Sequence, residues 1–61
     1  MDVATYPFLT HQEAMDAANR IFNFLDVITI VMPPLDGETE FMVAYCAEHD
    51  EKVRSFLKEG N

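Results

Sequence analysis

The chain is poor in the residues that build catalytic and metal sites. Its 61 residues include one cysteine, two histidines, two glycines and no tryptophan. A single cysteine excludes an internal disulfide, and the lack of a Cys/His cluster excludes the usual structural zinc site. With glycine only at Gly37 and Gly60, glycine-rich phosphate loops and dinucleotide-binding fingerprints are excluded as well. We therefore expect neither a metal nor another cofactor.

Basic residues are also scarce. Eleven acidic residues against four basic ones give a formal net charge of −7. Nucleic-acid binding draws its affinity from Lys and Arg side chains that neutralise phosphates, and anionic membranes attract basic segments for the same reason. The composition therefore predicts no direct binding to nucleic acid or to membranes. It favours either simple solubility or attraction to a partner protein with a basic surface.

Long apolar runs are missing too, since no stretch approaches the roughly 18 residues of a membrane span. Met1-Asp2-Val3 lacks the basic and apolar regions of a secretory signal, so we expect a cytoplasmic protein. Residues 1–61 contain no linker or repeat and are expected to form a single domain. A domain of about 60 residues buries only about 60% of the surface of its unfolded chain. Because no disulfide or metal adds stability, we expect a homodimer.

The pattern of the first half predicts a strand followed by a helix. Val3–Tyr6 has the character of a short strand, and Pro7 should close it because proline cannot donate to a sheet. Thr10 and Glu13 have the spacing of a capping box, which predicts that a helix begins there. Apolar residues then recur at intervals of three and four as far as Leu25, which forms one stripe on a helix of about four turns.

The second half predicts a hairpin and a short helix. The strand Val27–Met32 is ended by two prolines, and the loop Pro33–Glu38 is too long for a two-residue hairpin turn. A third strand, Phe41–Cys46, leads into an acidic segment that suits the start of a helix. The segment Glu48–Glu51 is expected at the start of this short last helix and Lys58 in its last turn, and Gly60 has the character of a C-cap.

The predicted element order is therefore β-α-β-β-α, which defines an α+β domain. A right-handed β-α-β crossover followed by a hairpin places the third strand in the middle. The result is a three-stranded sheet of order 1-3-2 with two helices on one face, a topology that corresponds to a truncated ferredoxin-like fold. The other face stays open, and we expect it to be used for dimerisation.

Both strands of the hairpin are apolar on both faces, whereas a half-solvated strand would alternate apolar and polar residues. We therefore expect a second polypeptide to cover one face. The predicted partner or dimer contacts are Ile28, Ile30, Met32, Phe41, Met42 and Tyr45. Acidic residues on or beside the protruding loop are expected to steer a basic partner, and they are Asp36, Glu38 and Glu40.

These features predict a small acidic, non-enzymatic, homodimeric protein-binding module, such as an inhibitor or regulator of a protein with a basic, nucleic-acid-binding surface. One alternative is a dimer that encloses a small ligand between facing sheets, with Tyr45, Thr29 and Cys46 as polar contacts. Another is a module that pairs with a partner's sheet along its open edge. An enzyme is not expected, because the one conceivable nucleophile and base, Cys46 and His49, lie where a strand closes and packing is the usual role of cysteine.

Overall fold

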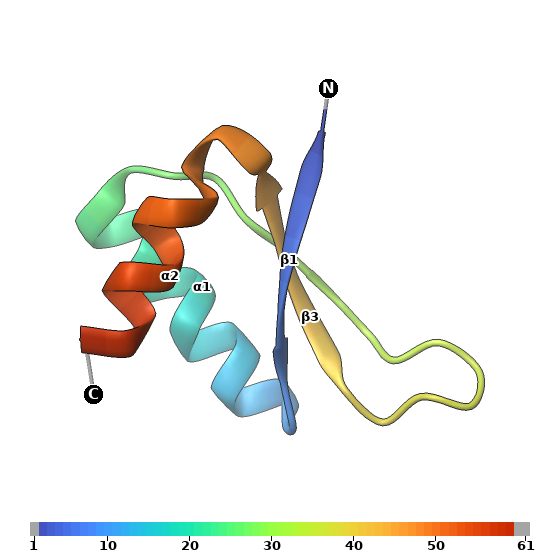
Figure 1. The fold of residues 1–61 in the computed structure, drawn as a ribbon. Helices are drawn as coiled ribbons and strands as arrows, with labels where there is room; N and C mark the ends of the chain where they lie inside the picture. Colours follow the sequence, from blue (N-terminus) through green and yellow to red (C-terminus); the bar gives the residue numbers. More distant parts are fainter. Residues whose placement is uncertain (1, 60–61) are drawn as a thin grey trace.

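The computed structural model describes residues 2–59. Three strands and two helices follow one another in the predicted order, β-α-β-β-α, and one turn of 3-10 helix precedes the last helix. The elements are β1 (Val3–Phe8), α1 (His11–Leu25), β2 (Ile30–Met32), β3 (Phe41–Cys46), η1 (Ala47–His49) and α2 (Asp50–Glu59). Both helices lie on one side of the sheet, and the loop between β2 and β3 projects away from them (Figure 1).

The sheet has the order β1-β3-β2, and both edge strands are antiparallel to β3. In the register of the sheet, Tyr6 lies opposite Val43 and Val43 lies opposite Val31. Residues that lie opposite each other share a face, so these three side chains all point to the same side. The structure thus confirms the α+β class, the two helices and the strand order 1-3-2.

Pro7 does not end β1, contrary to the sequence prediction, because the strand continues to Phe8. The amide of Ala47 donates to the carbonyl of Asp2 (3.0 Å), which sets the alternation of hydrogen bonds along this antiparallel pair. Every second residue, counted from Asp2, directs its backbone groups toward β3. Pro7 is not one of these residues. Its backbone groups point in the plane of the sheet, away from β3 and toward solvent. Its missing amide therefore costs the ladder no hydrogen bond, as is usual for proline in an edge strand.

The second strand is shorter than the predicted Val27–Met32, because only Ile30–Met32 pairs with β3. Asp26 caps α1 in the left-handed conformation (φ 57°), and its amide donates to the carbonyl of Phe22 (3.1 Å). This cap turns the chain away from the helix axis. Residues 27–29 then lead from the end of α1 to the sheet edge, with Val27 buried on the way.

The start of α1 follows the prediction. Thr10 is the N-cap, and its hydroxyl oxygen accepts a hydrogen bond from the amide of Glu13 (3.1 Å). The Thr10 hydroxyl also donates to Glu13 Oε1 (3.0 Å), so the two side chains hold each other across the first turn. This arrangement satisfies one of the amides that a helix start leaves without a partner.

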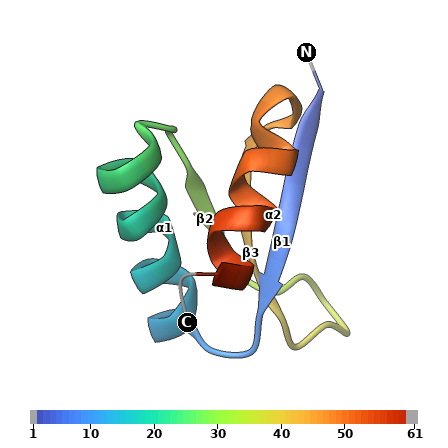
Figure 2. The same ribbon diagram turned by 60° about the vertical axis from the view of Figure 1, so that its left-hand side comes forward.

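The core lies between the helices and the sheet (Figure 2). Its fully buried side chains include Ile21 of α1, Val43 of β3 and Val53 of α2. Small residues on α1, Ala14 and Ala17, let the helix approach the sheet closely. The last helix begins at Asp50, within the acidic segment that the sequence places at its start, after the turn η1. The predicted C-cap at position 60 lies outside the described residues.

Candidate interaction surface

Neither α1 nor α2 lies over the opposite face of the sheet (Figure 1), although Ala44 on this face is buried and Met42 is half-buried. Alternation places Val3 of β1, Met42 of β3 and the β2 residues Ile30 and Met32 on this face. Val3 and Ile30 are each 64% exposed, and neighbouring Ile28 is 77% exposed. Large aliphatic side chains of this kind are usually buried, so the open face is an apolar surface without a cover.

Two shallow hollows lie on the open face. The first, of about 190 Å³, lies at the Cys46 end and is lined by Val3, Ile28, Ile30, Ala44, Tyr45 and Cys46. The second, of about 200 Å³, lies at the loop end and is lined by Met32, Pro33, Leu35, Glu38, Glu40 and Met42. Ile28 also lines a groove of about 330 Å³ beside α1, together with Met15 and Phe22. The apolar surface therefore continues from the sheet face around the β2 edge to α1.

The loop between β2 and β3 forms an acidic rim at one end of the open face. Its tip is a turn in which the amide of Glu38 donates to the carbonyl of Leu35 (2.9 Å). Gly37 occupies the position of this turn that requires a positive φ (82°), which glycine adopts without steric cost. The turn exposes Asp36 and Glu38, while Glu40 is half-buried where β3 begins.

Charge is distributed unevenly over the molecule. All four Lys and Arg residues lie on the helices, with Arg20 on α1 and Lys52, Arg54 and Lys58 on α2. The segment from 21 to 51 has no Lys or Arg and includes two of the three strands and the whole acidic loop. The open face is thus bordered by carboxylates, and the cationic side chains belong to the opposite layer.

The structure brings four of the six predicted interface residues together. Ile28, Ile30, Met32 and Met42 all belong to the open face. The side chains of Phe41 and Tyr45 alternate onto the helix side instead, although Tyr45 also contributes to the lining of the hollow at the Cys46 end. Tyr45 is only 3% exposed and belongs to the buried core. Phe41 is half-buried against that core, and the centre of its ring lies 5.5 Å from the centre of the His11 ring on α1.

Tyr45 is held by a polar network at the start of α2. Its hydroxyl donates to Asp50 Oδ1 (2.7 Å), and Arg54 Nε donates to both oxygens of the same carboxylate (3.0 and 3.1 Å). Burial, followed by the hydrogen bond to Asp50, raises the pKa of Tyr45 from 10.0 to about 12. The same hydrogen bond, assisted by Arg54, lowers the pKa of Asp50. The network therefore ties the central strand to α2.

Arg54 also reaches the free edge of β1. Its Nη2 donates to the carbonyl of Thr5 (3.3 Å), and its guanidinium lies 5.3 Å from the centre of the Tyr6 ring. The backbone groups of Thr5 point away from β3, at the free edge of the sheet. Because Arg54 already binds the Thr5 carbonyl, an added strand could not use this carbonyl as a hydrogen-bond acceptor. Pro7 removes an outward donor from the same edge. Both features make this edge a poor template for strand pairing.

The residues considered for catalysis do not form a pair. The Cys46 thiol donates to Glu48 Oε1 (3.5 Å), and His49 Nε2 lies 3.8 Å from the same oxygen. Within residues 2–59, no three His, Cys, Asp or Glu side chains are grouped so that they could hold a metal ion. Neither α1 nor α2 is long and apolar enough to cross a bilayer.

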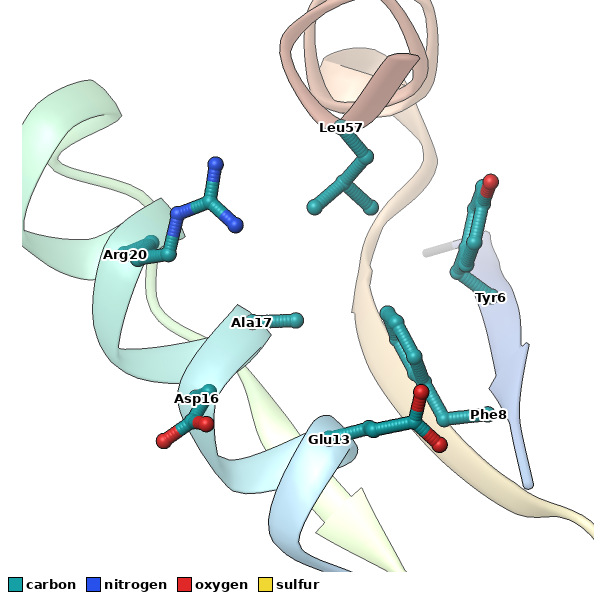
Figure 3. Close-up of a pocket in the computed structure, with 7 residues that line it drawn as sticks. All are labelled: Tyr6, Phe8, Glu13, Asp16, Ala17, Arg20 and Leu57. Atoms are coloured by element: carbon teal, nitrogen blue, oxygen red, sulfur yellow. The ribbon is translucent and has the colours of Figure 1, made fainter. Parts of the chain in front are cut away.

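The helix side has a hollow of its own, of about 270 Å³, between α1, α2 and β1. Figure 3 shows Arg20 of α1 on one side of it and Phe8 of β1 on the other, with Leu57 of α2 above and the Glu13 side chain extending from α1 toward Phe8. Glu13 is already bonded to the N-cap Thr10, and Arg20 lies 5.4 Å from the ring centre of Phe56. These side chains connect the two helices and β1 to each other.

Sequence reasoning missed two parts of the candidate surface. Val3 could have been found from the alternation of β1, which places it on the same face as Cys46. Leu35 had no signal, because only the path of the loop brings it to the hollow beside Met32. No family model, curated protein or solved structure matches the chain.

Proposed function

We propose that the protein is a non-enzymatic protein-binding module of the cytoplasm that acts through its open sheet face, as an inhibitor or regulator of a protein with a basic surface. The observation that carries this proposal is the row of exposed aliphatic side chains Val3, Ile28 and Ile30 on one sheet face. Contiguous apolar surface of this kind is typical of an interface between proteins. The acidic loop at its end favours a partner that is basic around an apolar centre.

The small size of the domain supports the same conclusion. A second polypeptide on the open face would add to a core that is small for an independent domain. Binding and folding stability are coupled in this proposal.

Homodimerisation through the same face is the second candidate. It is favoured by the small size of the domain, and in it the truncated ferredoxin-like sheet uses its open face against a second copy. The charge of −7 on each chain opposes it, because both copies would bring acidic loops to the contact.

Two other functions find less support. A ligand held between facing sheets would lose Tyr45 as a polar contact, because its hydroxyl is bonded to Asp50 on the helix side. A strand-pairing module would need a free sheet edge, and at β1 the carbonyl of Thr5 is occupied by Arg54. The open face is the better candidate.

Site-specific photo-crosslinking in the producing cells tests the proposal. A photoreactive phenylalanine analogue replaces Ile30 on the open face or, as the matched control, Leu9, which is 73% exposed and lines neither hollow of that face. We expect a discrete adduct from position 30 and none from position 9. An adduct of twice the chain mass would identify a homodimer, and a different mass would identify another protein. Equal adducts from both positions, or none from position 30, would contradict the proposal.

A further inference from the structure

We infer that the hollow between the open face and the acidic loop takes a long cationic side chain, arginine or lysine, from the protein that covers the face. The occupant is thus a polypeptide that presents a basic residue within an apolar segment, and not a second copy of this chain. This inference rests on the proposed function, because it specifies the partner of the same surface.

The walls of the hollow suit the apolar stem of such a side chain. Met32 and Met42 lie opposite each other in the sheet and line one part, and Pro33 and Leu35 of the loop line another. Lysine and arginine bury their methylene stems along apolar surface while the charged end stays at the rim. Thioether side chains are flexible and adapt to the shape of what they contact. The hollow of about 200 Å³ therefore combines apolar walls with carboxylates in its lining.

The rim supplies the opposite charge. Glu38 and Glu40 both line the hollow, and Glu40 is half-buried there. The ion pairs of His49 with Glu48 and of Arg54 with Asp50 involve carboxylates other than these two. A carboxylate that is partly withdrawn from water gains from a cation brought by a partner.

A second copy would not provide that cation from the surface it presents. The open face of a second copy has the same acidic rim, and the Lys and Arg residues of each chain lie on the helices. Face-to-face contact would place apolar side chains together but leave both acidic hollows without a counter-charge. Charge complementarity therefore favours a different protein over self-association.

A titration followed by NMR tests the hollow without any knowledge of the partner. The probe is N-acetyl-arginine methylamide, and its control is the citrulline analogue, which has nearly the same shape and no charge. The readout is the methyl resonances of Met32 and Met42, with the Met15 methyl on α1 as an internal reference. We expect the arginine probe to shift Met32 and Met42 while Met15 stays in place. We expect the citrulline probe to shift none of them.

A double variant, Glu38→Gln with Glu40→Gln, removes both rim charges and keeps the size of the side chains. Its matched control is Glu51→Gln with Glu59→Gln on α2, which changes the net charge by the same amount away from the hollow. We expect the rim variant to abolish the shifts caused by the arginine probe. The α2 variant should retain them. Equal shifts with citrulline, or shifts that survive in the rim variant, would overturn the inference.

Dilution of the protein without a probe tests the second copy. Met32 and Met42 shifts that depend on protein concentration would show self-association through the open face and overturn the choice of occupant. The crosslinking experiment can still succeed in that case. If the arginine probe causes no shifts but position 30 gives an adduct with another protein, the inference that the hollow binds a cationic side chain is refuted. The proposal that the open face binds a protein would still stand.

Discussion

Replacement of Tyr45 by phenylalanine should make the protein less sensitive to alkaline pH. The pKa of Tyr45 is raised from 10.0 to about 12 in the folded protein, chiefly by burial and next by the hydrogen bond to Asp50. Below pH 10 the phenol is neutral in both states, so its full contribution to stability is present. Between pH 10 and 12 the unfolded chain loses this proton while the folded chain keeps it, and the free energy of unfolding falls as pH rises.

The size of the effect follows from the shift. Two pH units correspond to roughly 3 kcal/mol, which is lost progressively as pH rises from 10 toward 12. At pH 11 about half of this is gone. Tyr45→Phe lacks the titrating group and should not show this part of the alkaline loss. At neutral pH the variant should be less stable than the wild type by about 1.5 kcal/mol, because it lacks the hydrogen bond to a charged acceptor.

Urea denaturation followed by circular dichroism, at neutral pH and at about pH 11, measures both quantities. Wild type and Tyr45→Phe are compared at each pH, so that other groups titrating in both proteins cancel. Tyr6→Phe serves as the control for a tyrosine that lies outside the hydrogen bond to Asp50, and it should keep the alkaline loss. An equal loss of stability in wild type and Tyr45→Phe would refute the assignment of a raised pKa to this phenol.

Two further substitutions test the fold by chemical denaturation. Thr10→Ala removes the side chain that caps α1 and should lower the free energy of unfolding by about 1 kcal/mol, whereas Thr10→Asn should retain most of it; equal loss in both variants would contradict the capping role. Ile21→Ala leaves a cavity in the fully buried centre of the core and should cost about 2 to 5 kcal/mol, against about 1 kcal/mol for Ile21→Val. A cost of less than about 1 kcal/mol for Ile21→Ala would show that this position is not packed as described.

Local signals in the sequence were sufficient for the helix starts and the central strand. The spacing of Thr10 and Glu13 predicted the N-cap, because capping depends on residues three apart and not on the rest of the fold. The end of β1 could not be predicted in this way. Whether a proline interrupts a strand depends on the direction in which its missing amide points, and that is set by the pairing of β1 with β3.

The sequence pattern was sufficient to predict the alternation of side chains along β3, but not which face of the strand the helices cover. The period of two separated Phe41 and Tyr45 from Met42 within β3, but both faces of this strand are apolar. Composition alone could not tell which face the helices cover. Tyr45 resolves this in the structure, because its hydroxyl meets Asp50 at the start of α2 and so identifies the helix side.

The position of β3 in the sheet has a consequence for the order in which the protein can form during synthesis. Within residues 2–59, β1 and β2 pair with β3 and not with each other. Residues 2–40, which leave the ribosome before β3, therefore contain two strands and no sheet. Phe41–Cys46 must enter between strands that are already made, and only then can the core close beneath α1. Until that step the apolar strands β1 and β2 of the nascent chain have no strand to pair with. The open face therefore forms at the same time as the rest of the fold.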